Sequence, residues 1–281
     1  MQKEKHTIMA QYLDPKNDLT FKRVFGEHKH LCMSLINSML PLKSPVVGIE
    51  YQTNELIPEL AGVLRNTIVD VRCTDGDGRQ FIVEMQMYWS ESFKNRVLLN
   101  ASKAYVKQLD QTKEFTLLQP VYALSFVNTI FEKSPEYYHY YKIVNISDTE
   151  KQIEGLEFAF VELPKYKPQN RAEKKLHDLW LRFLTEINES TTEVPQELRE
   201  NELVSEAVEY MNRGAYTKEQ LNTYDKWKID AMTEYSMQCD ALRKGRAEEK
   251  LEIAKNLKSL GIPVDQIAIA TKLAKEEIEK I

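Results

Sequence analysis

Hydrophobic residues follow a helical spacing at the start of the chain and a strand spacing after it. The first helix is expected from Asn17 or Asp18, which can act as N-cap, to Leu40, with Gly26 as a break in its apolar face. A second helix is expected from Ser90 or Ser92 to about Lys113. Short apolar runs bounded by turn residues predict strands. These runs cover residues 45–59, 63–73, 79–89, 120–128, 140–146 and 156–164.

After residue 166 the strand pattern stops and helical spacing takes over. Helix-like segments occupy residues 175–187, 202–212, 218–240 and 246–261, and the last twenty residues add two short helices. The pattern therefore predicts one α/β or α+β domain followed by an all-helical region. The expected divisions are a tail at 1–11, a domain at 12–166, a helical region at 167–240 and a C-terminal module at 241–281.

Two carboxylates interrupt the apolar runs of a predicted hairpin. Asp70 lies in "IVDV" and Glu84 in "FIVEMQM", on either side of the turn "DGDG". If the turn centres on Gly76–Asp77, alternation places Asp70 opposite Val83 or Glu84. Two neighbouring acids repel each other, and a divalent cation would offset the repulsion. A solvated hairpin face with alternating polar residues fits the same spacing equally well.

Composition narrows the class of protein. The net charge of −5 argues against a strongly basic, non-specific nucleic-acid binder, so any contact with nucleic acid must use a local patch. The longest uncharged run, residues 115–131, is shorter than the roughly 20 apolar residues of a membrane helix and reads as a buried strand. The isolated Cys32, Cys73 and Cys239 suggest neither zinc nor a disulfide framework. We therefore expect a cytoplasmic protein that does not enter membranes.

Four motifs occur in order along the chain. The pair Asp70 and Glu84, with Met85 and Gln86 directly after it, resembles the PD-(D/E)XK nuclease signature, with Gln86 in place of the lysine. Together the motifs resemble the Rpn family of recombination-promoting nucleases and transposases. Asn100 differs from that family, which often carries an aromatic residue there. The other matching positions are Asn17, Asp18, Phe21, Lys22, Phe25 and Gly26, then Arg96, Tyr105 and Gln108, then "VELPKY" and the Gly-Ile-Pro of the tail.

The resemblance implies a restriction-endonuclease-like core, with a mixed central sheet flanked by helices, and metal-dependent hydrolysis of DNA. Asp70, Glu84 and the carbonyl of Met85 would hold Mg²⁺, with Mn²⁺ as a substitute. The implied catalytic residues are Asp70, Glu84, Gln86 and Arg96. Glutamine can orient a water by hydrogen bonding but carries no charge, so a catalytically weak or inactive protein that binds DNA or another protein is the alternative. Lys22 or Lys103 could supplement Arg96.

The C-terminal module has two interpretations. Three short amphipathic helices around Gly261 and Pro263 resemble a helix-turn-helix DNA reader, and they equally resemble a helical pairing module. The last helix, "AKEEIEKI", is acidic, which disfavours contact with phosphates. We therefore expect protein–protein contact through the C-terminal helices, by self-association or by control of the nuclease domain, rather than DNA reading.

Overall fold

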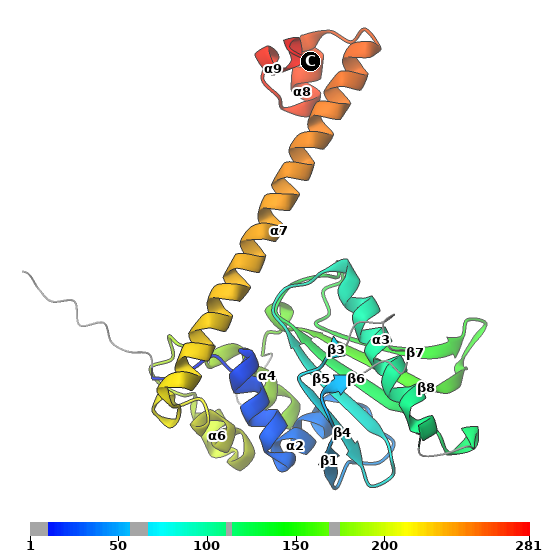
Figure 1. Cartoon of the computed structure of the whole chain (residues 1–281), viewed down its shortest axis with the longest axis vertical. Coiled ribbons are helices and arrows are strands. Elements are labelled where there is room, and N and C mark those ends of the chain that lie inside the picture. Colours follow the sequence, from blue (N-terminus) through cyan, green and yellow to red (C-terminus); the bar gives the residue numbers. More distant parts are fainter. Residues whose placement is uncertain (1–10, 57–66, 111–113, 169–174) are drawn as a thin grey trace, which may run out of the picture. The chain divides into compact units, whose positions relative to one another are not determined.

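The first part of the chain is a mixed β-sheet with helices on both faces, which confirms the predicted α/β class (Figure 1). The computed structural model describes residues 11–56, 67–110, 114–168 and 175–281. The predicted tail at 1–11 lies outside these ranges except for Gln11. By compactness the chain divides into two units, Met1–Trp227 and Lys228–Ile281. The domain limits expected from the sequence remain predictions.

The main sheet has the strand order β1-β4-β5-β6-β8-β7. Strands β5, β6 and β8 are parallel, and the remaining neighbours are antiparallel. A small antiparallel pair, β2 and β3, lies beside it in sequence. The strands are β1 Ile49–Tyr51, β2 Glu55–Leu56, β3 Thr67–Ile68, β4 Val71–Asp75, β5 Gln80–Gln86, β6 Val121–Val127, β7 Tyr138–Asn145 and β8 Asp148–Glu162.

Local sequence sets the ends of the first helices. The side chain of Asn17 accepts a hydrogen bond from the N–H of Leu19 at 2.9 Å, as expected of an N-cap. Gly26 ends a π-helical turn, which confirms the predicted break. The helices are α1 Asp18–Phe21, η1 Lys22–Gly26, α2 Lys29–Met39, α3 Glu91–Lys107, η2 Gln108–Asp110, η3 Phe115–Leu117, η4 Leu163–Lys165, α4 Leu176–Glu186, α5 Gln196–Glu200, α6 Glu202–Glu209, η5 Arg213–Ala215, α7 Lys218–Ser259, α8 Val264–Thr271 and α9 Lys275–Glu279.

The two faces of the sheet bury different clusters. On one face Val83 and Leu124 pack under the first helices and α4. On the other face Ile82 and Ala123 pack under α3, which contributes Val97 to the same cluster. Because side chains alternate along a strand, the even-numbered residues of β5 lie between the sheet and α3. This layer contains the candidate site.

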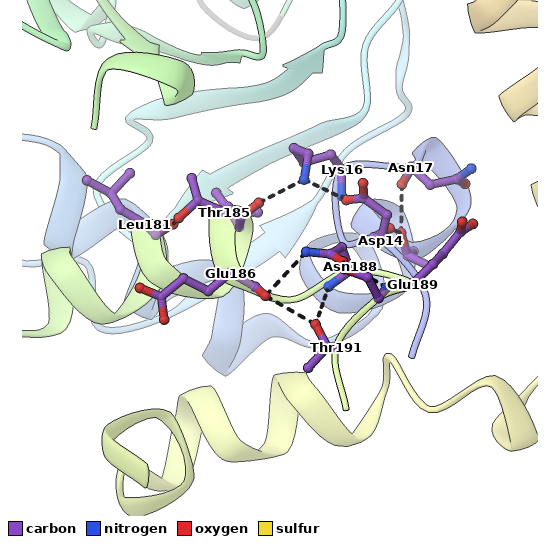
Figure 2. A network of polar contacts seen from close by, with 12 residues as sticks. Asp14, Lys16, Asn17, Leu181, Thr185, Glu186, Asn188, Glu189 and Thr191 are labelled. Atoms are coloured by element: carbon purple, nitrogen blue, oxygen red, sulfur yellow. Dashed lines mark hydrogen bonds and ion pairs between the residues drawn. The ribbon is translucent and has the colours of Figure 1, made fainter. Parts of the chain in front are cut away.

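A polar network ties the N-terminal segment to the end of α4 (Figure 2). The ammonium group of Lys16 donates to the carbonyl of Leu184 at 3.1 Å and pairs with Asp14 at 2.9 Å. In the loop after α4, Thr191 donates to the carbonyl of Glu186 at 3.1 Å. These contacts satisfy carbonyls that the helix end leaves without a partner, and they fix the segment that leads into α1.

The second unit contains most of α7 and the two short helices predicted for the tail. Ala254, Ile267 and Ile278 form its small core. Gly261 has φ of 79°, as expected for the residue that ends a helix, and Pro263 caps α8. Helix α7 runs through Asp240 without a break, so the segments expected at 218–240 and 246–261 form one helix. No helix among the residues described here is long and apolar enough to cross a membrane.

Candidate active site

The two hairpin acids lie close together, Glu84 on the α3 face of β5 and Asp70 beside β5, where its carboxylate meets the N–H of Met85. Glu84 is in β5, and Asp70 is in the short break between β3 and β4. The register pairs Val71 with Val83. Continued by one residue, it places Asp70 opposite Glu84, one of the two registers expected from the sequence. The charge of Asp70 acts on Glu84, and neither side chain is exposed, so the two acids lie close together rather than on a solvated surface.

Asp70 is held from both sides. Its Oδ2 atom accepts a hydrogen bond from the N–H of Met85 at 2.7 Å, and its Oδ1 atom lies 3.8 Å from the ammonium group of Lys22. Lys22 also pairs with Asp18 at 2.6 Å, so the N-terminal motif borders the site. Burial raises the pKa of Asp70 to about 6; Asp18 adds to this effect, while Met85 and Lys22 oppose it.

Glu84 is more deeply buried, with 6% of its surface exposed. The amide nitrogen of Asn100 in α3 lies 3.5 Å from Oε1, at the limit of a hydrogen bond. Burial and the negative charge of Asp70 raise the pKa of Glu84 to about 7, against the opposing effects of Arg96 and Asn100. A buried carboxylate with so little compensation costs free energy, which points to a role beyond folding.

Three buried oxygen atoms at or beside Glu84 have no hydrogen-bond partner in the described part of the chain. They are Oε2 of Glu84 itself, Oδ1 of Asn100 and Oγ of Ser125, which is the neighbour of Glu84 on β6. Oxygen donors of this kind suit a hard divalent cation, and Mg²⁺ typically uses one or two carboxylates and keeps several waters. No group of three His, Cys, Asp or Glu side chains in the described ranges forms a metal cluster. The two carboxylates and the oxygens beside Glu84 are donors of the kind that Mg²⁺ takes.

The backbone of Met85 points toward Asp70. The N–H of Gln80 and the carbonyl of Gln86 bond to the β6 side of the strand. By alternation, the backbone groups of Met85 face the β4 side, where its N–H donates to Asp70. The carbonyl of Met85 lies on that same side of β5, as the predicted metal-ligand role requires. The role itself remains a prediction.

Gln86 and Arg96, the other two predicted catalytic residues, contact each other. The guanidinium of Arg96 donates to the side-chain oxygen of Gln86 at 2.6 Å, and the Gln86 amide donates to the carbonyl of Tyr88 at 2.7 Å. Arg96 also lies over the ring of Phe93, at 4.9 Å from its centroid. The position that a lysine occupies in the PD-(D/E)XK signature thus holds a neutral glutamine, which accepts a hydrogen bond from the positively charged guanidinium of Arg96.

The remaining motif residues serve the fold. Tyr105 packs in the cluster under α3, and Gln108 bonds to the backbone of Gln119 at 2.8 and 3.0 Å. The carboxylate of Glu162, in "VELPKY", is fully buried and binds Lys165 at 2.6 Å and His139 at 2.8 Å. Burial opposes ionisation of Glu162, but these bonds and two backbone N–H groups outweigh it and lower its pKa.

The sequence pattern of one protein family matches residues 15–236, which include every residue of the site. The chain belongs to the PD-(D/E)XK nuclease family transposases. The match extends well beyond the sheet, into α7. Comparison with curated proteins and with solved structures gives no match. Membership of the transposase family implies a nuclease that acts in transposition, and nucleases of the PD-(D/E)XK kind typically use a divalent metal ion.

Two site residues were missed by sequence reasoning. Asn100 is, in the sequence, only a departure from the related family, and Ser125 lies in the apolar run "VYALSFV". Both carry a signal that could have found them. Asn100 continues the buried stripe of Phe93 and Val97 at a spacing of three to four residues, and Ser125 is polar in a strand that is buried throughout. A buried polar residue in an apolar stripe is the informative observation.

Proposed function

We propose that this transposase-family protein is a metal-dependent DNA endonuclease whose active site is built on Asp70 and Glu84. The observation that supports this most directly is the repulsive, buried pair of carboxylates, with unpartnered oxygens beside it. Asp70, Glu84 and the Met85 carbonyl would hold Mg²⁺, and Mn²⁺ could replace it. When bound, the ion would lower the pKa of a water and polarise the scissile phosphate.

The side chains around the acids have separable tasks in this proposal. Met85 fixes the Asp70 carboxylate through its N–H, and Asn100 orients Glu84. Gln86 positions Arg96, whose remaining N–H groups bind the oxygens of a substrate phosphate. The cation that a lysine would supply at position 86 is thereby supplied from α3. Glutamine then serves as a positioning residue rather than a base.

The first test is nicking of supercoiled plasmid by the full chain with Mg²⁺. Wild type is expected to nick. Glu84→Ala is expected to nick about 100-fold or more slowly, because a bound metal ion contributes several kcal/mol to stabilising the charge of the transition state. Glu114→Ala is a matched control outside the site. Wild type that binds DNA but does not nick with either Mg²⁺ or Mn²⁺ would favour the alternative of an inactive, binding protein with a nuclease fold.

We also propose that α7 mediates self-association. Met232, Cys239 and Leu242 are exposed and fall on one helical stripe. Replacing Met232 and Leu242 together with glutamate is expected to lower the mass in solution, measured by light scattering at matched concentration. Met237→Glu is the control, since Met237 is equally exposed but lies on another side of the helix. An unchanged mass in the double variant would exclude this stripe as the contact.

A further inference from the structure

A polar cavity lies on the α3 face, at the other end of the hairpin from the candidate active site. It has a volume of about 410 Å³ and lies near the Asp75–Gly78 turn, with Arg72, Thr74, Gln80 and Lys107 among its lining residues. Asp70 and Glu84 are at the opposite ends of the two strands. At about 3.3 Å per residue, Gln80 lies roughly 13 Å along β5 from Glu84. The cavity is therefore distinct from the candidate metal site.

Arg72 is a buried cation without a carboxylate partner among the described residues. It is 4% exposed; one guanidinium nitrogen donates to the side-chain oxygen of Gln80 at 2.8 Å, and Nε has no partner. Burial lowers its pKa. The other buried arginines differ, because Arg79 pairs with Asp75 at 2.7 Å and Arg182 pairs with Glu186 at 3.1 Å. An unpaired buried charge costs free energy, so an absent anion is the simplest compensation.

The surroundings of Arg72 favour an anion. Lys107, at the end of α3, brings a second cation to the cavity, and Thr74 brings a hydroxyl group. Asp77 is the one acid among the described lining residues. Its side chain is 74% exposed and lies 3.7 Å from the guanidinium of Arg79, which offsets its charge. The local charge is therefore positive although the chain as a whole is acidic.

We propose that this cavity binds a phosphate group, with the Arg72 guanidinium and the Lys107 ammonium as its cations. A guanidinium fork matches the oxygens of phosphate in a bidentate arrangement. A volume of about 410 Å³ falls within the usual range for small-molecule sites, so a nucleoside attached to the phosphate also fits. The source is either a free nucleotide or the phosphorylated end of a nucleic-acid strand. The proposal does not depend on cleavage at Asp70 and Glu84.

Calorimetric titration of the full chain without divalent metal tests this site. The probes are inorganic phosphate, deoxyadenosine monophosphate and a short 5′-phosphorylated oligonucleotide at constant ionic strength. Wild type is expected to bind them, and Arg72→Met is expected to bind about tenfold or more weakly, since it loses charged hydrogen bonds. Lys107→Ala is expected to lose less. Arg199→Met is the matched control, because Arg199 is exposed on α5 and pairs with Glu193 at 3.5 Å.

A second readout separates binding from folding. Arg72→Met is expected to melt at or above the temperature of the wild type without phosphate, and phosphate is expected to stabilise only the wild type. If Arg72→Met does not fold, Lys107→Ala and Thr74→Val decide. Stronger binding of the oligonucleotide than of the mononucleotide assigns the strand end, and equal binding assigns the nucleotide. No binding of any probe by wild type, or undiminished binding by Arg72→Met, overturns the proposal.

The phosphate site and the proposed nuclease site are tested by different measurements, phosphate binding for the first and DNA cleavage for the second. Glu84→Ala is expected to keep the wild-type affinity for inorganic phosphate, because Glu84 does not line the cavity. A protein that binds phosphate through Arg72 but does not cleave DNA would retain this inference and lose the proposed function. Loss of phosphate binding in Glu84→Ala, which removes a negative charge, would show that the two sites are not independent and overturn the separate site.

Discussion

Replacing Asp70 with asparagine is expected to reduce Mg²⁺-dependent nicking by about 100-fold or more. The same change is expected to raise the melting temperature of the metal-free protein. Asparagine keeps an oxygen that can accept the N–H of Met85, but it removes the negative charge that raises the pKa of Glu84. Plasmid nicking and differential scanning calorimetry on the same preparations measure both effects. Opposite changes in activity and stability distinguish a functional acid from a structural one.

The matched control is Glu50→Gln. Glu50 is an exposed acid on β1 of the same sheet and pairs with Lys29 at 2.8 Å. The Glu50→Gln variant is expected to nick plasmid at the wild-type rate. Nicking by Asp70→Asn at the wild-type rate would remove Asp70 from the site. A melting temperature several degrees below that of wild type would show that the carboxylate of Asp70 stabilises the fold.

The free energy of unfolding of the metal-free protein is expected to fall as pH rises from about 4 to about 7, because Asp70 and Glu84 ionise in this window. Asp70 and Glu84 have ordinary pKa values of 3.8 and 4.5, and folding raises them to about 6 and about 7. In this window the folded state holds more protons than the unfolded state, so the free energy of unfolding falls with rising pH. Of the charges that face the pair, Asp18 raises the pKa of Asp70, whereas Lys22 lowers the pKa of Asp70 and Arg96 lowers that of Glu84.

The contribution of the pair is isolated by comparison with the double variant Asp70→Asn and Glu84→Gln. One pKa unit corresponds to about 1.4 kcal/mol, and folding raises the pKa of each acid by about two units or more. Wild type is therefore expected to lose roughly 6 kcal/mol relative to the double variant across the window, measured by urea unfolding. Mg²⁺ is expected to stabilise wild type, with affinity rising about tenfold per pH unit between the pKa values of Asp70 and Glu84. Parallel stability curves for the two proteins would show that the pair ionises normally.

The helix starts, the hairpin and the α/β class could be predicted because they depend on local residues. The N-cap at Asn17, the break at Gly26 and the turn at Asp75–Gly78 all appear in the structure. The length of β8 could not be predicted, because its first half is polar and exposed and is a strand only through pairing with β7. The continuity of α7 could not be predicted because its apolar pattern changes near Asp240 and Gly245, a poor helix former, follows within the same helix.

In the candidate site too, some features could be predicted from the sequence and others could not. Asp70 and Glu84 could be found from spacing because one hairpin carries both. The contact of Arg96 with Gln86 could not, because it depends on how α3 lies across β5. The same holds for Asn100, which meets Glu84 only through that packing. Sequence identified the residues that one element positions, whereas contacts between elements required the structure.

The hydrogen bond from Met85 to Asp70 makes one backbone amide a sensor of the site. Most amides of a sheet donate to carbonyls, whose charge does not change with pH, but this N–H donates to a carboxylate. Its nuclear magnetic resonance frequency therefore follows the charge on Asp70 directly. A single ¹⁵N-labelled methionine signal can report protonation, ion binding and substrate arrival in the full-length protein, with no dye, no mutation and no turnover.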